Sequence, residues 1–369
     1  MIDTLIHSCS NMKRVSSAAA EAYAKESEQI VNLVSLQIVS DPRIPLLVGN
    51  TPPSFLQDRL AGRAGFMRNV FRLNSCELLV RAVAWEYRVQ NARGFSFDYF
   101  PIEFSAWKGA VPQRLEPSCA EEVIAVYDWL IRNHQAMVLL SLADEGLTSP
   151  MPVISEVQDS LLTLLLQGNS KQCLELVSRE VHDLAQLKSF YLDQLYPVLC
   201  RLGLLWEKNE ISVAEEHLAT AIVGRITAAL YVRIARSEYS RGKAVVTAGP
   251  GELHEVGARM VADFLEMEGW EVIYLGGNIS AEEIIFTLQR LNPFLVAMSV
   301  TTVFHLDAAW RLIHRIKSEP GTEKIRVLLG GFAFNCVPRL SIDFEADGYE
   351  MDAAGAASTA NAWWEHRKP

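Results

Sequence analysis

The chain has 369 residues, of which 50% are hydrophobic and 21% are charged. This composition is typical of folded proteins and excludes disorder along most of the chain. The net charge is −10, with 14 basic and 16 acidic residues in 1–150 and 20 and 28 in 151–369. Neither part has the basic excess of nucleic-acid-binding domains, so we expect no direct DNA binding. No apolar stretch reaches the roughly 20 residues of a membrane span, and we expect no membrane association.

The cysteines are widely scattered and form no Cys-x-x-Cys pair. This spacing favours neither a zinc site nor a disulfide framework. The first residues also lack the basic and apolar regions of a signal peptide. We therefore expect a cytoplasmic protein with reduced thiols. The six cysteines are Cys9, Cys76, Cys119, Cys173, Cys200 and Cys336.

Residues 1–146 are expected to form a helical domain. Ser118, with Glu121 three residues later, fits the Ser-x-x-Glu capping box, and Gly146 is expected to end the helix that begins there. An aromatic-rich segment lies at 94–111. The expected helices span residues 17–36, 65–91 and 118–144.

Two further zones follow, with an expected fold class of α plus α/β. Residues 151–240 contain four apolar runs that predict a four-helix bundle, punctuated by glycines. Residues 243–369 alternate strand and helix, which predicts a doubly wound, Rossmann-like parallel sheet that binds ligands at the carboxyl ends of its strands. The expected strands are 243–248, 270–275, 293–300, 325–329 and a fifth near Tyr349.

The loop after the first expected strand contains Glu252, His254 and Gly257. A histidine here can present one ring nitrogen to a ligand while the nearby carboxylate holds the other nitrogen and fixes the tautomer. Taken alone, a loop histidine is more often an ordinary surface residue. The positions of other small and polar residues along the zone therefore decide its interpretation.

Small and polar residues lie at the ends of three expected strands, at defined intervals in the sequence. Gly257 and Ser299 are separated by 41 residues, and Thr301 and Gly330 by 28 residues. Gly331 completes a glycine pair. Small residues at neighbouring strand ends allow a bulky group to lie close to the backbone.

This pattern resembles the signature of cobalamin-binding domains, over about residues 243–360. The resemblance implies that His254 is the lower axial ligand of cobalt and that Glu252 holds the other nitrogen of His254. Glu252 stands where most members of the family have Asp. The resemblance also implies that the dimethylbenzimidazole tail of the cofactor enters a slot beside Ser299, Thr301, Gly330 and Gly331.

The bundle zone contains Trp206, then nine residues, then Glu216 and His217. Alone, the tryptophan favours a core position and the Glu-His pair a solvated helix face. Together with the downstream motif, the pattern resembles the cap of CarH-type light sensors. That resemblance implies adenosylcobalamin, with Trp206 packed on the adenosyl group, Glu216 on its ribose and His217 as a donor or ligand. Glu207 departs from the family, which has a histidine there that ligates cobalt after illumination.

The N-terminal zone lacks the helix-turn-helix of CarH proteins. Its general architecture resembles globin-like sensor modules and photocobilins, which join a cobalamin domain to a biliverdin-binding region. Cys76 or Cys119 could anchor a bilin, although buried inert thiols are the more common case. The candidates for a biliverdin site are Arg88, Arg93, Arg132 and His134 for the propionates, and Phe97, Tyr99, Phe100 and Trp107 for the walls. The alternative is that these aromatic residues belong to the core and that the arginines lie on a solvated face.

The sequence therefore predicts a photoreceptor that holds adenosylcobalamin and is not an enzyme. Loss of the adenosyl group in light is expected to change self-association in a homo-oligomer or the binding of a protein signalling partner. The alternative is a methyl-corrinoid carrier protein for a methyltransferase, which needs neither Trp206 nor Glu216. An interaction protein that has lost its cofactor is a third interpretation.

Overall fold

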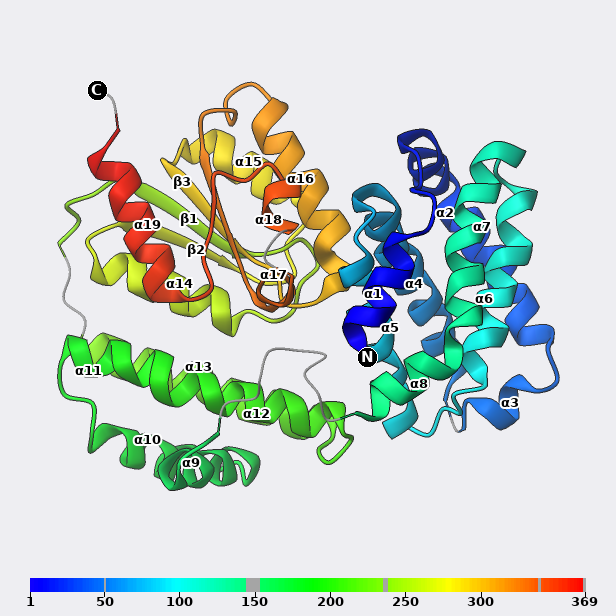
Figure 1. The fold of residues 1–369 in the computed structure, drawn as a ribbon. Helices are drawn as coiled ribbons and strands as arrows, with labels where there is room; N and C mark the ends of the chain where they lie inside the picture. Colours follow the sequence, from blue (N-terminus) through cyan, green and yellow to red (C-terminus); the bar gives the residue numbers. More distant parts are fainter. Residues whose placement is uncertain (50, 144–152, 235–237, 338–339, 368–369) are drawn as a thin grey trace. The chain divides into compact units, whose positions relative to one another are not determined.

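The computed structural model describes residues 1–49, 51–143, 153–234, 238–337 and 340–367. The chain divides into two compact units (Figure 1). The first unit comprises Met1–Thr148 and Glu207–Asn209, and the second comprises Ser149–Trp206 and Glu210–Pro369. The predicted fold class, a helical first part followed by a bundle and a parallel sheet, is confirmed. No helix of the described residues is both long and apolar enough to cross a membrane.

Eight α-helices form the described part of the first unit. The predicted helix at 17–36 is confirmed and continues to Ser40. Ser16 caps this helix, because its side chain accepts a hydrogen bond from the N–H of Ala19. The helices are α1 (Ile2–Ser10), α2 (Ser17–Ser40), α3 (Ile44–Leu47), α4 (Pro53–Leu73), α5 (Cys76–Ala92), α6 (Tyr99–Ala110), α7 (Pro117–Arg132) and α8 (His134–Leu142).

Two of the helices predicted for the first unit are each divided into two helices in the structure, so these predictions are wrong in part. The helix expected at 65–91 is broken because Asn74 adopts a left-handed conformation with φ of 49° and Ser75 caps a new helix. The helix expected at 118–144 is divided at Asn133. Ser118 is not its cap: the helix begins at Pro117, whose fixed φ suits the first turn. The expected stop at Gly146 lies outside the described residues.

A buried ionic cluster occupies the centre of the first unit. Arg59 lies between Glu103, at 2.6 Å, and Glu86, at 2.9 Å, and Arg63 pairs with the same two carboxylates at 3.2 and 2.5 Å. All four side chains are at most 5% exposed. Removal of any one would leave an uncompensated buried charge, which is strongly destabilising. The aromatic side chains of α6 pack around this cluster, with Tyr99 5.0 Å from the Arg59 guanidinium.

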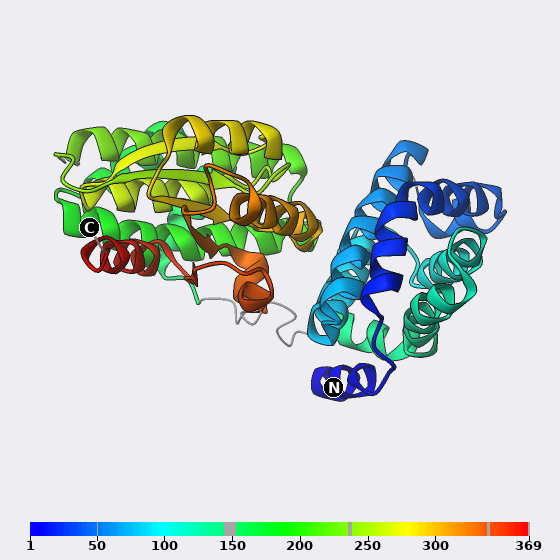
Figure 2. The ribbon, with the colours of Figure 1, turned by 90° about the horizontal axis from the view of Figure 1, so that it is seen from above.

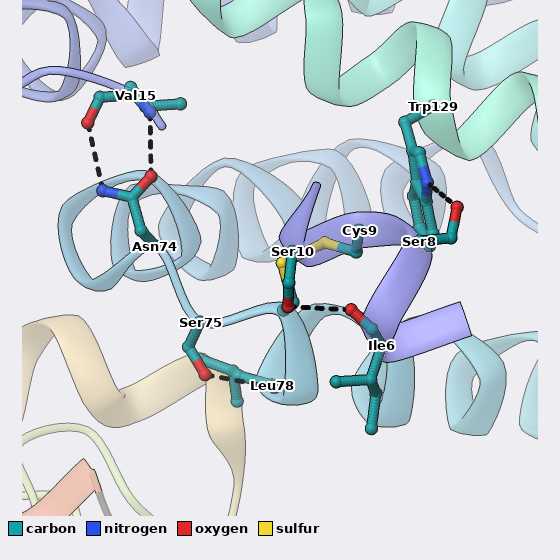
Figure 3. The surroundings of a disulfide bond; sticks show 10 residues. Ile6, Ser8, Cys9, Ser10, Val15, Asn74, Ser75, Leu78 and Trp129 are labelled. Atoms are coloured by element: carbon teal, nitrogen blue, oxygen red, sulfur yellow. Dashed lines mark hydrogen bonds between the residues drawn. A yellow bond between two sulfur atoms is a disulfide. The ribbon is translucent and has the colours of Figure 1, made fainter. Parts of the chain in front are cut away.

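A disulfide joins α1 to α5 (Figure 3), which corrects the prediction that all thiols are reduced. Cys9 and Cys76 are 67 residues apart in sequence, and their Cα atoms lie 5.7 Å apart. Packing brings them together, because Cys9 is buried and α1 rests against α5. Trp129 fixes α1 from the other side by donating its indole N–H to Ser8 at 3.1 Å. The cysteine spacing gives no signal for this pairing.

We expect Cys9→Ser to destabilise the first unit by roughly 2–4 kcal/mol, because the disulfide restricts the unfolded chain. Thermal unfolding with and without reductant measures the loss. Cys119→Ser is the control, since Cys119 is a free thiol. Equal melting of oxidised and reduced wild type would contradict the expectation.

The second unit begins with the predicted four-helix bundle. Its third helix is a continuous segment in three parts that includes one π-helical stretch, Phe190–Leu195. Extra backbone width of this kind often occurs near functional sites. The bundle consists of α9 (Glu156–Leu166), α10 (Ser170–Ser178), α11 (Leu184–Ser189) with η2 (Phe190–Leu195) and α12 (Tyr196–Glu207), and α13 (Val213–Ile234).

A parallel five-stranded sheet follows, in the order β2-β1-β3-β4-β5. Helices α14 and α19 cover the face toward the bundle, and α15 and α16 cover the other face (Figures 1 and 2). The five strands are β1 (Lys243–Ala248), β2 (Glu271–Gly276), β3 (Leu295–Ser299), β4 (Arg326–Gly330) and β5 (Gly348–Tyr349). The helices are α14 (Val256–Met267), α15 (Ala281–Leu291), α16 (Leu306–Ser318), α17 (Phe332–Cys336), α18 (Leu340–Asp343) and α19 (Ala353–Glu365).

Bundle and sheet share one hydrophobic core, and α14 lies between them. Polar bonds reinforce this packing. Tyr191 donates its hydroxyl to Asp263 at 2.7 Å, and Tyr231 donates to Glu266 at 2.6 Å. Burial raises the pKa of Asp263 to about 6, although the Tyr191 hydroxyl and the charge of Arg259 act in the opposite direction.

We expect Asp263→Asn to alter the pH dependence of stability. The wild-type carboxyl, with a pKa of about 6 against a reference of 3.8, binds a proton more readily in the folded protein. As the pH falls from about 7 to about 4, the free energy of unfolding of the wild type should therefore rise relative to that of the variant. The gain is at most about 3 kcal/mol. Denaturant unfolding at several pH values measures this difference, and parallel profiles would contradict it.

Candidate functional site

The carboxyl ends of the central strands bring the predicted motif residues together. Ala248 of β1 lies opposite Ser299 of β3, and Ser299 lies opposite Gly330 of β4. The loop with Glu252 and His254 leaves this edge directly after β1. All pieces of the cobalamin-type motif, far apart in sequence, therefore meet at one edge of the sheet.

Glu252 is fully buried and holds this edge together. One of its oxygens, Oε1, accepts hydrogen bonds from His254, at 2.5 Å from Nδ1 and 3.2 Å from the backbone nitrogen. Its other oxygen, Oε2, accepts the backbone N–H groups of Thr301 and Thr302, both at 3.0 Å. Burial disfavours the charge, but bonds from His254, His305 and Thr302 outweigh it and hold the pKa of Glu252 well below its usual range.

His254 is oriented for ligand binding. The bond to Glu252 commits Nδ1, whereas Nε2 makes no hydrogen bond within the part of the chain that the structure describes. The His254 side chain is 55% exposed. The Glu252 bond raises the pKa of His254, burial opposes this, and the charges of Glu252 and Glu216 add to the increase. A neutral imidazole with a carboxylate on Nδ1 is a strong metal ligand through Nε2.

The glycines of the motif have specific packing roles. Gly331 has φ of 97°, and a Cβ atom there would lie 2.4 Å from the carbonyl oxygen of Val300. Glycine therefore lets the ends of β3 and β4 approach each other. At Gly257 a Cβ atom would lie 3.5 Å from Oγ of Ser299, an ordinary contact. The close neighbour of Gly331 is thus backbone, and the place of Gly331 beside the cofactor tail stays a prediction.

The predicted upper residues lie on the bundle. Trp206, near the end of α12, is half-buried and packs against the shared core. Glu216 and His217 lie in the first turn of α13, where Nδ1 of His217 is 2.6 Å from Oε2 of Glu216. His217 is 70% exposed and Glu216 23%. The charge of Glu216 contributes to the raised pKa of His254.

Most of the residues expected to bind biliverdin are buried or paired within the first unit. The aromatic residues Tyr99, Phe100 and Trp107 are fully buried. Phe100 stacks on Tyr87 and Trp107 on Tyr127, and Tyr99 meets Phe100 edge-on. Arg88 donates to the carbonyls of Ser141 and Ala143. The remaining candidates pair locally: Arg93 with Val89, Arg132 with Asp128 and His134 with Tyr87. Biliverdin binding stays a prediction.

One residue of the site was missed by the sequence analysis. Nδ1 of His305 lies 3.1 Å from Oε2 of Glu252 and 2.9 Å from the Thr302 hydroxyl. His305 lies six residues after the end of β3. The motif residues at this strand end are Ser299 and Thr301, so the motif does not include His305. Its position soon after a buried strand was the available signal.

Comparison with known proteins identifies the ligand class. Residues 242–358 match a family model described as a B12 binding domain, and residues 157–231 match a second model with the same description. The second unit binds a corrinoid. Both the bundle and the sheet domain are thus parts of a corrinoid-binding module, as the sequence predicted. The residues within it that contact the cofactor remain predictions.

Several known proteins are similar to this chain. A corrinoid protein of Desulfitobacterium hafniense is 22% identical over 57% of the chain and 98% of its own length. The HTH-type transcriptional repressor CarH of Myxococcus xanthus is 28% identical over 38% of the chain, and the methanol–corrinoid protein of Methanosarcina barkeri is 28% identical over 33%. The chain spans 46% of the length of each of these two relatives.

Two solved structures are similar to parts of this chain at low identity. The monomethylamine corrinoid protein of Methanosarcina barkeri has a TM-score of 0.49 and 18% identity, over 56% of this chain and 97% of its own. A cobalamin-binding protein from Desulfitobacterium hafniense has a TM-score of 0.32 and 18% identity, over 56% and 98%.

We expect Glu252→Gln to weaken corrinoid binding about 10- to 100-fold, because the amide no longer provides a charged acceptor for His254. Glu252→Asp, which restores the charge, should recover most of the affinity. Glu271→Gln, at the opposite end of the sheet, is the matched control and should bind as wild type does. Equilibrium titration followed by absorbance measures the affinities. Wild-type affinity in Glu252→Gln would contradict the role of this carboxylate.

Proposed function

We propose that this chain is a non-enzymatic corrinoid protein in which His254 ligates cobalt from below and the bundle covers the upper face. The observation that carries the proposal is the bond between the buried Glu252 carboxylate and Nδ1 of His254, which leaves Nε2 available. A bound corrinoid would supply cobalt with an exchangeable upper ligand. The functional question is therefore which upper ligand the bundle accommodates.

The first candidate is a carrier of a methyl group for a methyltransferase partner. The names of several curated relatives support it, since they include methanol– and dimethylamine–corrinoid proteins. One corrinoid protein is also matched along 98% of its length. These relatives favour a carrier over a light sensor. In a carrier, His254 and Glu252 hold the cofactor, and the bundle moves away when the partner approaches.

The second candidate is an adenosylcobalamin-dependent photoreceptor. Trp206, Glu216 and His217 favour it, together with the similarity to CarH. The half-buried indole of Trp206 offers an apolar wall, and Glu216 offers an acceptor for hydroxyl groups. Glu207 cannot replace the histidine that the CarH resemblance expects, so a histidine ligand in the light state would have to come from elsewhere, for example His217. Biliverdin in the first unit, self-association and a signalling partner belong to this candidate.

Reconstitution of the full chain separates the two candidates. If the chain is a carrier, we expect methylcobalamin to bind at least as tightly as adenosylcobalamin. The molecular mass of the protein in solution should then not change after green light. A photoreceptor should prefer adenosylcobalamin in the dark and change its assembly state in light. Absorbance titration and size-exclusion chromatography with light scattering measure both properties.

Variants sharpen this comparison. Glu216→Gln should leave the ratio of the two affinities unchanged in a carrier. In a photoreceptor it should reduce adenosylcobalamin affinity about tenfold or more, because a hydrogen bond to a charged group is lost. Glu175→Gln, an exposed position on α10, is the matched control. Failure of the wild type to bind either corrinoid would contradict both candidates.

A further inference from the structure

Glu207, the residue that departs from the CarH pattern, belongs to the first unit. It ends α12, yet Glu207–Asn209 are part of the same compact unit as Met1–Thr148. Oε1 of Glu207 accepts a hydrogen bond from the indole N–H of Trp85, at 2.7 Å. Trp85 lies on α5, next to Glu86 of the buried ionic cluster. The partner of Glu207 is thus carried by a helix that the ionic cluster and the disulfide hold in place.

The surroundings of Glu207 compensate its charge. Burial raises the pKa of Glu207. The Trp85 hydrogen bond opposes this increase, and so do the charges of Arg88 and Arg93. Arg88 lies on α5, and Arg93 directly follows that helix. One segment of the chain therefore supplies a hydrogen-bond donor and two positive charges to a single carboxylate.

The turn after Glu207 is fixed at both ends. Asn209 adopts a left-handed conformation with φ of 58°. The N–H of Glu210 donates back to the carbonyl of Leu205 at 2.9 Å, which closes the end of α12. The Ser212 hydroxyl accepts a backbone N–H of the first turn of α13 at 3.2 Å. A restraint on the end of α12 therefore also restrains Trp206, one residue earlier, and the start of α13.

We propose that Glu207 anchors the turn between α12 and α13 to Trp85 and thereby preorganises the bundle for the upper ligand of a corrinoid. This inference rests on the proposed function and makes Glu207 a positioning residue. An anchored turn leaves Trp206 less freedom to lose when a corrinoid binds, so anchoring favours binding. By reciprocity, corrinoid binding strengthens the contact of Glu207 with Trp85 by the same factor.

A purely local role for Glu207 makes a different prediction. If the contact only stabilises the fold of the first unit, its loss should lower the free energy of unfolding and leave corrinoid affinity unchanged. If the contact preorganises the bundle, its loss should also weaken corrinoid binding. The affinity therefore separates the two roles.

The anchor itself is tested in the cofactor-free full chain. Nitrogen-15 spectra of tryptophan report the indole N–H of Trp85, and Trp85→Phe identifies its signal. We expect Glu207→Gln, which keeps the shape of the side chain and removes its charge, to move this signal. Glu210→Gln should not move it and is the matched control, because Glu210 is exposed in the same turn.

The consequence for the bundle is tested by absorbance titration with methylcobalamin and adenosylcobalamin in the dark. We expect Glu207→Gln and Trp85→Phe each to weaken binding about fivefold or more. The double variant should bind no more weakly than either single variant, since both remove one contact. Glu210→Gln should bind as wild type does.

Two results would overturn the inference. One is an unmoved Trp85 signal in Glu207→Gln, which would exclude the anchor. The other is wild-type affinity of Glu207→Gln for both corrinoids, which would leave the contact a local role only. If the wild type binds neither corrinoid, the proposed function fails, and the tryptophan spectrum still shows whether Trp85 holds Glu207.

Discussion

The site depends on one buried carboxylate. A fully buried charge such as that of Glu252 is costly unless several donors compensate it. Here the donors come from two segments that are almost fifty residues apart in sequence: the loop after β1, with His254, and the turn after β3, with Thr301 and Thr302. The requirement to satisfy Glu252 therefore fixes both segments against each other and fixes the ring of His254 at the edge of the sheet.

The position of α14 connects this loop with the bundle. The helix starts two residues after His254 and carries Asp263 and Glu266, which accept hydrogen bonds from tyrosines of the bundle. The bundle and the His254 loop are thus both joined to the same helix. A change in the packing of the bundle on α14 would reach the His254 loop through a continuous helix. This arrangement suits either a carrier whose bundle must move or a sensor whose bundle reports the upper ligand.

The strands could be predicted from sequence because their signals are local, and the site motif could be predicted because its spacing resembles that of cobalamin-binding domains. Buried parallel strands appear as apolar runs such as Lys243–Ala248, and the interval from His254 to Ser299 places polar residues at one sheet edge. The breaks at Asn74 and Asn133 depend on single residues that also occur inside helices. The disulfide of Cys9 and the contact of His305 with Glu252 depend on tertiary packing, which periodicity does not report.

The proposed function requires that the imidazole of His254 ligates cobalt. The most direct measurement is electron paramagnetic resonance of the full chain loaded with cobalt(II) cobalamin, produced with nitrogen-15 histidine. We expect the two-line coupling of one axial nitrogen-15 nucleus in the wild type and its loss in His254→Ala. A three-line coupling from the nitrogen-14 of the cofactor's own base, or an unchanged spectrum in His254→Ala, would contradict it.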